Sequence, residues 1–172
     1  MARRIVTGNH ADGKSYFVSD GETQHRVDLG RSILDDIWVD EPGRPASDND
    51  YDPVASGYFS LVAPGGASVV RVATQMPGTR SDMPSEAELE ENRARWDAGG
   101  AMEQEDPAMH TTPTIDYGIV LEGEVVLELD EGETVMRAGD IVVQRRTRHA
   151  WRNRGDKPCT MVFVMISSPA YQ

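Results

Sequence analysis

The chain has 172 residues, 38% of them hydrophobic and 27% charged, which is enough for one domain around one hydrophobic core. Its net charge of -12 disfavours binding to nucleic acid and to anionic membrane surfaces, and its single cysteine excludes an internal disulfide and a cysteine-based zinc site within one chain. No apolar run approaches the ~20 residues that span a bilayer, and no signal-peptide-like stretch follows the first arginines, so we expect a soluble, cytoplasmic protein.

Short apolar runs that end in turn residues make up the first part of the chain. They are SYFVSDGE (15–22), ILDDIWVDEPG (33–43) and GASVVRVATQMPG (66–78). Runs of this kind between turn signals are typical of antiparallel β-strands. Residues 40–57 are rich in Pro, Asp and Gly, so we expect a long loop there.

One segment, SEAELEENRARWDAGG at 85–100, has the pattern of a helix. Ser85 with Glu88 three residues later is a capping-box signature, and the closing Gly pair is a helix stop. Leu89, Arg93 and Trp96 fall on one helical face, at i, i+4 and i+7, and that face is only weakly apolar. Two interpretations stay open: a surface excursion that covers one end of the fold, or a lid that brings Trp96 to a substrate.

Strand patterns continue in the last part of the chain. They are GIVLEGEVVLELDEGETVMRAGDIVVQ (118–144) and CTMVFVMISS (159–168). Val125, Leu127 and Leu129 alternate with mostly polar neighbours, the period of a strand with one face in the core. DEGE at 130–133 predicts a hairpin turn, and AGD at 138–140 predicts the next bend. No internal repeat is visible, which argues against two duplicated barrels.

A histidine and an aspartate lie at even spacing in the stretch HTTPTIDYGIVLEG. A strand period of two places His110, Thr112, Thr114 and Asp116 on one face. In a straight strand about 20 Å would separate His110 from Asp116, too far for ligands of one metal ion. Pro113 cannot donate to a sheet ladder, which is a physical reason for a bend between them.

A second histidine, His149, follows the strand pattern DIVVQ after a short polar turn. From there it can reach back to His110 across a small barrel. Two imidazoles with the Asp116 carboxylate form a facial triad that leaves coordination positions open, which suits Fe(II) and also Mn, Ni or Zn. The residues expected to bind a metal are therefore His110, Asp116 and His149. Without an ion, the two histidines form an acid–base or hydrogen-bonding pocket, or a structural pair.

These residues carry a resemblance to the cupins, and in particular to small single-domain cupins of bacteria. The first cupin motif has the form G-x5-H-x-H-x(3,4)-E-x6-G, and the second has the form G-x5-P-x-G-x2-H-x3-N. The first motif is matched at its first histidine, its acidic position and its closing glycine by His110, Asp116 and Gly123. The second is matched at its glycine, histidine and asparagine by Gly139, His149 and Asn153.

The chain departs from the cupin pattern at five motif positions. Gln104 stands in place of the opening glycine of the first motif. Thr112 stands where the family has its second histidine, and an aspartate replaces the glutamate at 116. In the second motif Arg145 and Thr147 replace the proline and the glycine, and the turn before His149 is one residue shorter. The resemblance implies a double-stranded β-helix barrel whose pocket has an altered or absent metal site.

Four residues are expected to bind the substrate: Thr112, Gln144, Arg146 and Trp151. Gln144 and Trp151 flank the turn that carries His149, and Trp151 either forms an aromatic wall of the pocket or belongs to the core. Arg146 is part of a local cluster of arginines that can attract a carboxylate or phenolate group. Alternatively, these arginines are rim residues paired with the abundant Asp and Glu.

The expectation is thus an all-β cupin, or jelly-roll, barrel in which residues 1–172 form one domain. Its parts are N-terminal strands and a long loop at 1–57, the barrel at 58–84 and 101–172, and a helical insertion at 85–100. The resemblance implies a homodimer, because cupin arms often add a strand to a neighbour's sheet. It also implies an enzyme that acts on a small oxygenated or aromatic molecule by dioxygenation, decarboxylation, isomerisation or lyase chemistry, with His110 and His149 as catalytic residues. The alternatives are a metal-free binder of small molecules and a purely structural dimer.

Overall fold

The computed structural model describes residues 2–44, 49–55, 60–78, 84–96, 101–103, 105–106 and 108–167. Within these ranges the chain forms eleven β-strands, all paired antiparallel, and one α-helix. The strands are β1 (Arg3–Asn9), β2 (Ser15–Glu22), β3 (Arg26–Asp28), β4 (Ser32–Asp40), β5 (Ser68–Gln75), β6 (Thr114–Glu122), β7 (Glu124–Glu128), β8 (Glu133–Arg137), β9 (Ile141–Arg145), β10 (Ala150–Arg152) and β11 (Cys159–Ser167). The helix is α1 (Glu86–Trp96), and it is not long and apolar enough to cross a membrane.

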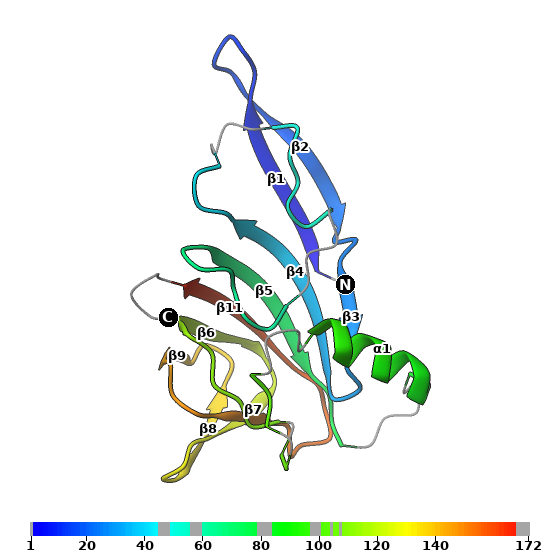
Figure 1. Ribbon diagram of the computed structural model, residues 1–172, viewed down its shortest axis with the longest axis vertical. Coiled ribbons are helices and arrows are strands. Elements are labelled where there is room, and N and C mark those ends of the chain that lie inside the picture. Colours follow the sequence, from blue (N-terminus) through cyan, green and yellow to red (C-terminus); the bar gives the residue numbers. More distant parts are fainter. Residues whose placement is uncertain are drawn as a thin grey trace.

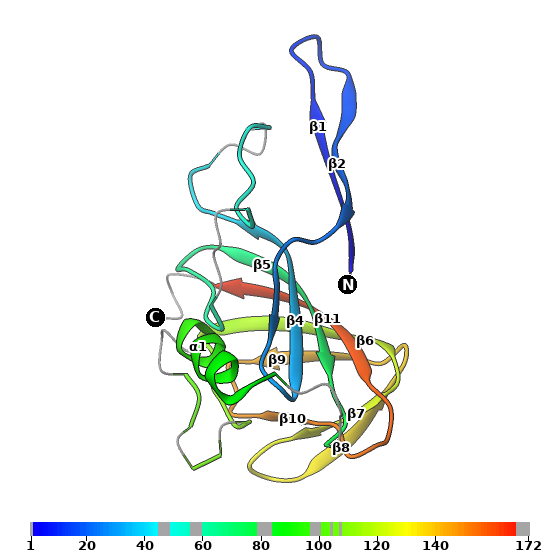
Figure 2. The ribbon, with the colours of Figure 1, turned by 90° about the vertical axis from the view of Figure 1, so that its right-hand side faces the viewer.

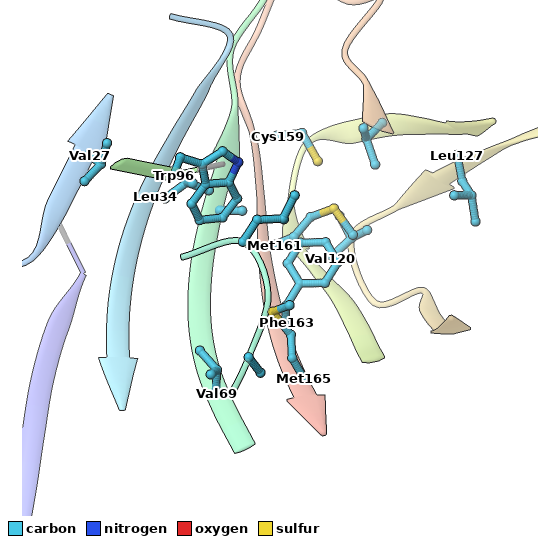
Figure 3. Close-up of a cluster of buried hydrophobic side chains, with 14 of the residues drawn as sticks. Val27, Leu34, Val69, Trp96, Val120, Leu127, Cys159, Met161, Phe163 and Met165 are labelled. Carbon is cyan, nitrogen blue, oxygen red and sulfur yellow. The ribbon is translucent and has the colours of Figure 1, made fainter. Parts of the chain in front are cut away.

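Two of the three sheets enclose the core. A six-stranded sheet has the order β3-β4-β5-β11-β6-β9, and a three-stranded sheet has the order β10-β7-β8 (Figures 1 and 2). Side chains from both sheets, such as Val69, Leu127 and Phe163, belong to one buried cluster (Figure 3). The fold is the all-β double-stranded β-helix with one short helix that the sequence predicts.

Strict alternation along β5 and β11 builds the inner face of the large sheet. Every second residue of these strands is buried, from Val69 to Gln75 and from Cys159 to Ser167. Cys159 is fully buried, and burial raises the pKa of its thiol to about 11. It is a small apolar residue of the core.

The N-terminal segment divides into two parts. β1 and β2 form a hairpin that projects from the barrel (Figures 1 and 2). β3 and β4, which the sequence pattern assigns to the strands outside the barrel at 1–57, instead belong to the large sheet, where β4 pairs with β5 along its length. The physical reason is burial: Leu34 and Val39 point into the core and need the barrel to cover them.

The helix begins as its sequence predicts. The Ser85 backbone N–H donates to Glu88 Oε2 at 2.9 Å, and the Glu88 N–H donates to Ser85 Oγ at 3.3 Å, so the capping box is formed. Leu89 and Trp96 are buried, whereas Arg93 is mostly exposed. The predicted stop at residues 99 and 100 lies outside the described residues.

Both predicted turns of the C-terminal part are present, at Gly132 between β7 and β8 and at Gly139 before β9. One detail of the predicted alternation is wrong. Leu129 is 39% exposed, because β7 ends before it, and Val126, on the face expected to be mostly polar, is buried.

Gly123, between β6 and β7, allows a close approach of two chain segments. Its φ of 79° is in the left-handed region, and a Cβ atom there would lie 2.5 Å from the Pro158 carbonyl oxygen. The substitution Gly123→Ala should therefore lower the free energy of unfolding by about 3 kcal/mol or more, measured by urea denaturation.

The matched control is Gly132→Ala. Gly132 also has a left-handed φ, of 99°, but apart from its chain neighbours no atom lies within 4 Å of the point that a Cβ atom would occupy. Its substitution should cost only the backbone strain, about 1 kcal/mol. Equal losses for the two variants would contradict the clash with Pro158.

Candidate functional site

Two reciprocal backbone hydrogen bonds join His110 to His149. The N–H of each residue donates to the carbonyl oxygen of the other at 3.0 Å. His110 precedes the bend at Pro113 that leads into β6, and His149 precedes β10. The bridge therefore brings the two motif histidines together from segments far apart in the sequence, and their ring centroids lie 4.3 Å apart.

The hydrogen bonds of the two rings fix their protonation pattern. His110 Nδ1 lies 3.0 Å from the Ala108 carbonyl oxygen, and His149 Nδ1 lies 2.9 Å from the Thr147 carbonyl oxygen. Because a carbonyl oxygen can only accept, each Nδ1 carries the proton. Each neutral ring then keeps the Nε2 lone pair for a ligand or for a proton.

Burial keeps both imidazoles neutral near pH 7. It lowers the pKa of His149 to about 4, helped by the nearby His110, and it also lowers the pKa of His110. The hydrogen bonds to the two carbonyl oxygens oppose this effect only in part.

The histidines lie in the wall of a cavity of about 850 Å³ inside the barrel. Its lining comes from strands of both enclosing sheets, from α1 and from residues 101–112. Much of the wall is apolar, with the side chains of Leu34, Leu61, Trp96, Trp151, Phe163 and Met165. The volume lies in the range typical of small-molecule sites.

Comparison with known proteins assigns the chain to a family. A family model described as "Cupin domain" matches residues 98–165. The "phomopsin biosynthesis cluster protein C'" of Diaporthe leptostromiformis is 35% identical over 96% of this chain and 78% of its own length. The chain belongs to the cupin superfamily.

A second relative of this cupin is the "cupin-domain-containing oxidoreductase fogC" of Aspergillus ruber, 28% identical over 95% of the chain and 71% of the relative. Both relatives are fungal, so the expected likeness to bacterial cupins in particular is not supported. Among solved structures, a putative ethanolamine utilization protein q from Salmonella typhimurium aligns with 98% of each chain at 10% identity and a TM-score of 0.45.

Asp116 lies on β6 and faces the cavity, and its side chain is buried. Its Oδ1 atom has no hydrogen-bond partner in the part of the chain that the structure describes. Burial raises the pKa of this carboxyl group to about 6, against the opposing effects of the Thr114 hydroxyl and the Arg71 charge.

The described residues do not fit the metal set expected from the cupin motifs. Among them no three His, Cys, Asp or Glu side chains are grouped so that they could hold a metal ion. His110 and His149 are brought together, but Asp116 does not complete the triad. The reason is register: His110 bridges to His149, whereas Asp116 lies beyond the bend, paired with Met165 on one side and Gln144 on the other.

Two of the four residues expected to bind substrate line the cavity. Thr112 is buried there, and its Oγ1 accepts a hydrogen bond from Thr114 Oγ1 at 2.8 Å. Trp151 packs edge-on against the rings of His149 and Phe163, with centroid distances of 5.7 and 5.4 Å.

The other two expected substrate residues lie outside the cavity lining. Gln144 is buried, and its side-chain amide donates to Thr147, which holds the turn before His149. Arg146 is exposed in that turn, with a left-handed φ of 57°. Its neighbour Arg148 pairs with Glu103 and Asp130, as the rim interpretation of this arginine cluster predicts.

Arg71 is a cavity residue that the motif spacing does not indicate. Its guanidinium donates to both Asp36 carboxylate oxygens and to the Ser60 carbonyl oxygen, and it lies 4.4 Å from the ring centroid of Trp96. The sequence does indicate a special role for this residue, because an arginine occupies a core-facing position between Val69 and Ala73.

The histidine pair should make stability depend on pH. In the unfolded chain His149 takes up a proton near pH 6.5, whereas in the folded protein its pKa is about 4. The stabilising contribution of neutral His149 is therefore complete above pH 6.5 and is lost as the pH falls toward 4, by up to about 3 kcal/mol.

The check is urea unfolding between pH 7.5 and 4.5 for the protein and for His149→Gln. The variant should lose this part of the pH dependence, so the two stability curves should converge as the pH falls. His10→Gln, at an exposed position, is the control and should follow the parent curve. A constant offset between parent and His149→Gln would contradict the assignment.

Proposed function

We propose that the protein is an enzyme that holds a small oxygenated or aromatic molecule in the barrel cavity and transfers a proton on it with His110 and His149. The observation that carries the proposal is the pair of neutral imidazoles in the cavity wall, each with Nδ1 bound to a carbonyl oxygen. Each Nε2 is then available as a general base. The apolar remainder of the wall suits an aromatic or cyclic molecule.

The short distance between the two imidazole rings limits how many protons the pair can carry. With centroids 4.3 Å apart, two imidazolium ions would repel each other, so the pair carries at most one extra proton near neutral pH. One Nε2 takes a proton from the substrate and returns it at a second position. This transfer serves isomerisation or the elimination of water, the isomerase and lyase types of cupin chemistry, and needs no co-reactant.

A redox reaction is the second candidate, favoured by relatives named cupin-domain-containing oxidoreductases. In that case a divalent ion, Fe, Mn, Ni or Zn, would be bound through His110 and His149. Among the described residues no third His, Cys, Asp or Glu side chain is grouped with these two, which supports the proton-transfer proposal over the redox one.

Hydrogen–deuterium exchange tests the proton transfer. Cyclic hydroxyketones and hydroxylated aromatic ketones would be incubated with the protein in D2O, and deuterium at carbon would be followed by NMR. Exchange should fall at least about 100-fold in His110→Ala and in His149→Ala. Binding without exchange for every compound would favour the alternative of a metal-free binder without turnover.

Elemental analysis separates the two candidates. The protein and the double variant His110→Ala, His149→Ala would be purified without a tag after growth with added Fe, Mn, Ni and Zn. Proton transfer without an ion predicts far less than one equivalent of metal in both. Near one equivalent in the protein and none in the double variant would overturn that proposal and favour the redox candidate.

The proposal includes a homodimer. Ile141, Val143 and Tyr117 lie on the outer face of β9 and β6 and are 66%, 52% and 42% exposed, and Tyr117 is the cross-strand neighbour of Val143. Two chains that each carry a charge of -12 repel each other, so an apolar patch without acidic side chains is the favourable place for them to meet.

Sedimentation velocity tests the dimer. A Val143→Glu, Ile141→Glu variant should be monomeric, because burying these carboxylates in an interface is costly. Phe17→Glu on the projecting β1–β2 hairpin should leave the dimer intact. The opposite pattern would assign the contact to the N-terminal arm, and a monomeric parent protein would contradict the dimer.

A further inference from the structure

We propose that Asp116 recognises a hydroxyl group of the substrate, so that the enzyme acts on a neutral, hydroxylated ring compound. This inference rests on the proposed function and adds a substrate class to it. It gives Asp116 a role other than that of the third metal ligand that the cupin motif implies.

The first support is an acceptor that the fold leaves unused. Asp116 is 5% exposed, and its Oδ1 has no hydrogen-bond partner among the described residues. A buried polar group without a partner costs about 1–3 kcal/mol, and more when it is charged. A ligand that donates a hydrogen bond there would recover this free energy on binding.

The second support is that the neighbouring donors make other bonds. The Arg71 guanidinium donates to Asp36 and Ser60, and the Gln144 amide donates to Thr147. The Thr114 hydroxyl lowers the pKa of Asp116 but leaves Oδ1 without a hydrogen bond. The cavity, which Asp116 lines, is where a ligand can supply the missing donor.

The charges around Asp116 restrict the donor. An anionic ligand group is repelled by the carboxylate, and an ammonium group loses its hydration shell on entering a cavity whose wall is largely apolar. A neutral hydroxyl donates to a carboxylate without either penalty. The rings of Trp96, Trp151 and Phe163 in the same wall suit a cyclic or aromatic body.

The test compares pairs of compounds that differ by one hydroxyl, such as 3-hydroxybenzaldehyde with benzaldehyde and 3-hydroxycyclohexanone with cyclohexanone. Dissociation constants would be measured by ligand-observed NMR. The protein should bind the hydroxylated member of at least one pair tenfold or more tightly. Asp116→Leu should abolish this preference while it still binds the other member, and Asp116→Ala serves if the leucine variant does not fold.

A stability readout separates binding from a structural role. Asp116→Leu should raise the melting temperature, because it removes a carboxylate that the fold does not satisfy. Ser167→Ala is the matched control, since Ser167 Oγ is also buried without a partner among the described residues but does not line the cavity. That control should leave the hydroxyl preference unchanged.

Three results would overturn the inference: no preference in the protein, a preference that persists in Asp116→Leu and Asp116→Ala, or loss of bound metal in these variants. Failure of the proposed function looks different. In that case His110→Ala, His149→Ala would leave any deuterium exchange unchanged, whereas the hydroxyl preference would still depend on Asp116.

Discussion

The reciprocal hydrogen bonds between His110 and His149 are the contact on which the site depends. They fix the segment before β6 to the turn before β10 and so close the barrel at this point. The same local geometry occurs on both sides, because each ring donates from Nδ1 to the carbonyl oxygen two residues earlier, at Ala108 and Thr147. Backbone pairing thus positions the imidazoles before any ligand binds, which lowers the entropic cost of using the two rings together in the proposed proton transfer.

Asp36 and Asp116 are buried acidic side chains near the cavity that differ in their hydrogen-bond partners. Asp36 is neutralised by Arg71 in a two-bond ion pair, so neither charge is left unpaired. Asp116, also buried, receives no such partner for Oδ1 from the described residues. The carboxylate without a hydrogen-bond partner in the cavity wall lowers the stability of the folded protein. Such a loss of stability is typical of a residue that is kept for binding.

Local patterns in the sequence predicted the helix and the longer strands of the barrel, but not the short strands β3 and β10. The capping box at Ser85, the turns at Gly132 and Gly139, and the core-facing alternation of β11 depend only on nearby residues. The face shared by His110 and Asp116 could also be predicted, because it follows from strand period alone.

The geometry of the candidate site depends on long-range register. Whether Asp116 reaches the histidines is decided by how β6 pairs with β11 and β9 after the bend, which motif spacing does not encode. Gln144 and Arg146 were selected for their nearness in sequence to His149, but one is bonded to its own turn and the other faces solvent. Arg71 had a usable signal, a charge on the inner face of an apolar strand, whose partner Asp36 comes from the neighbouring strand.

The helix α1 shows how a cupin insertion contributes to the pocket. Trp96 at its end is 6% exposed, lies against Arg71, and accepts a hydrogen bond at its carbonyl oxygen from the Leu61 N–H at 3.0 Å. The Asn92 side chain also donates to the Asp28 carbonyl oxygen. Moving the helix away would cost about 3 kcal/mol of tryptophan burial and about 1 kcal/mol for each hydrogen bond, so an open form would be well below about 1% of molecules. Of the two interpretations of this segment, the geometry therefore favours a fixed cover with Trp96 as a permanent part of the cavity wall over a lid that opens in each turnover.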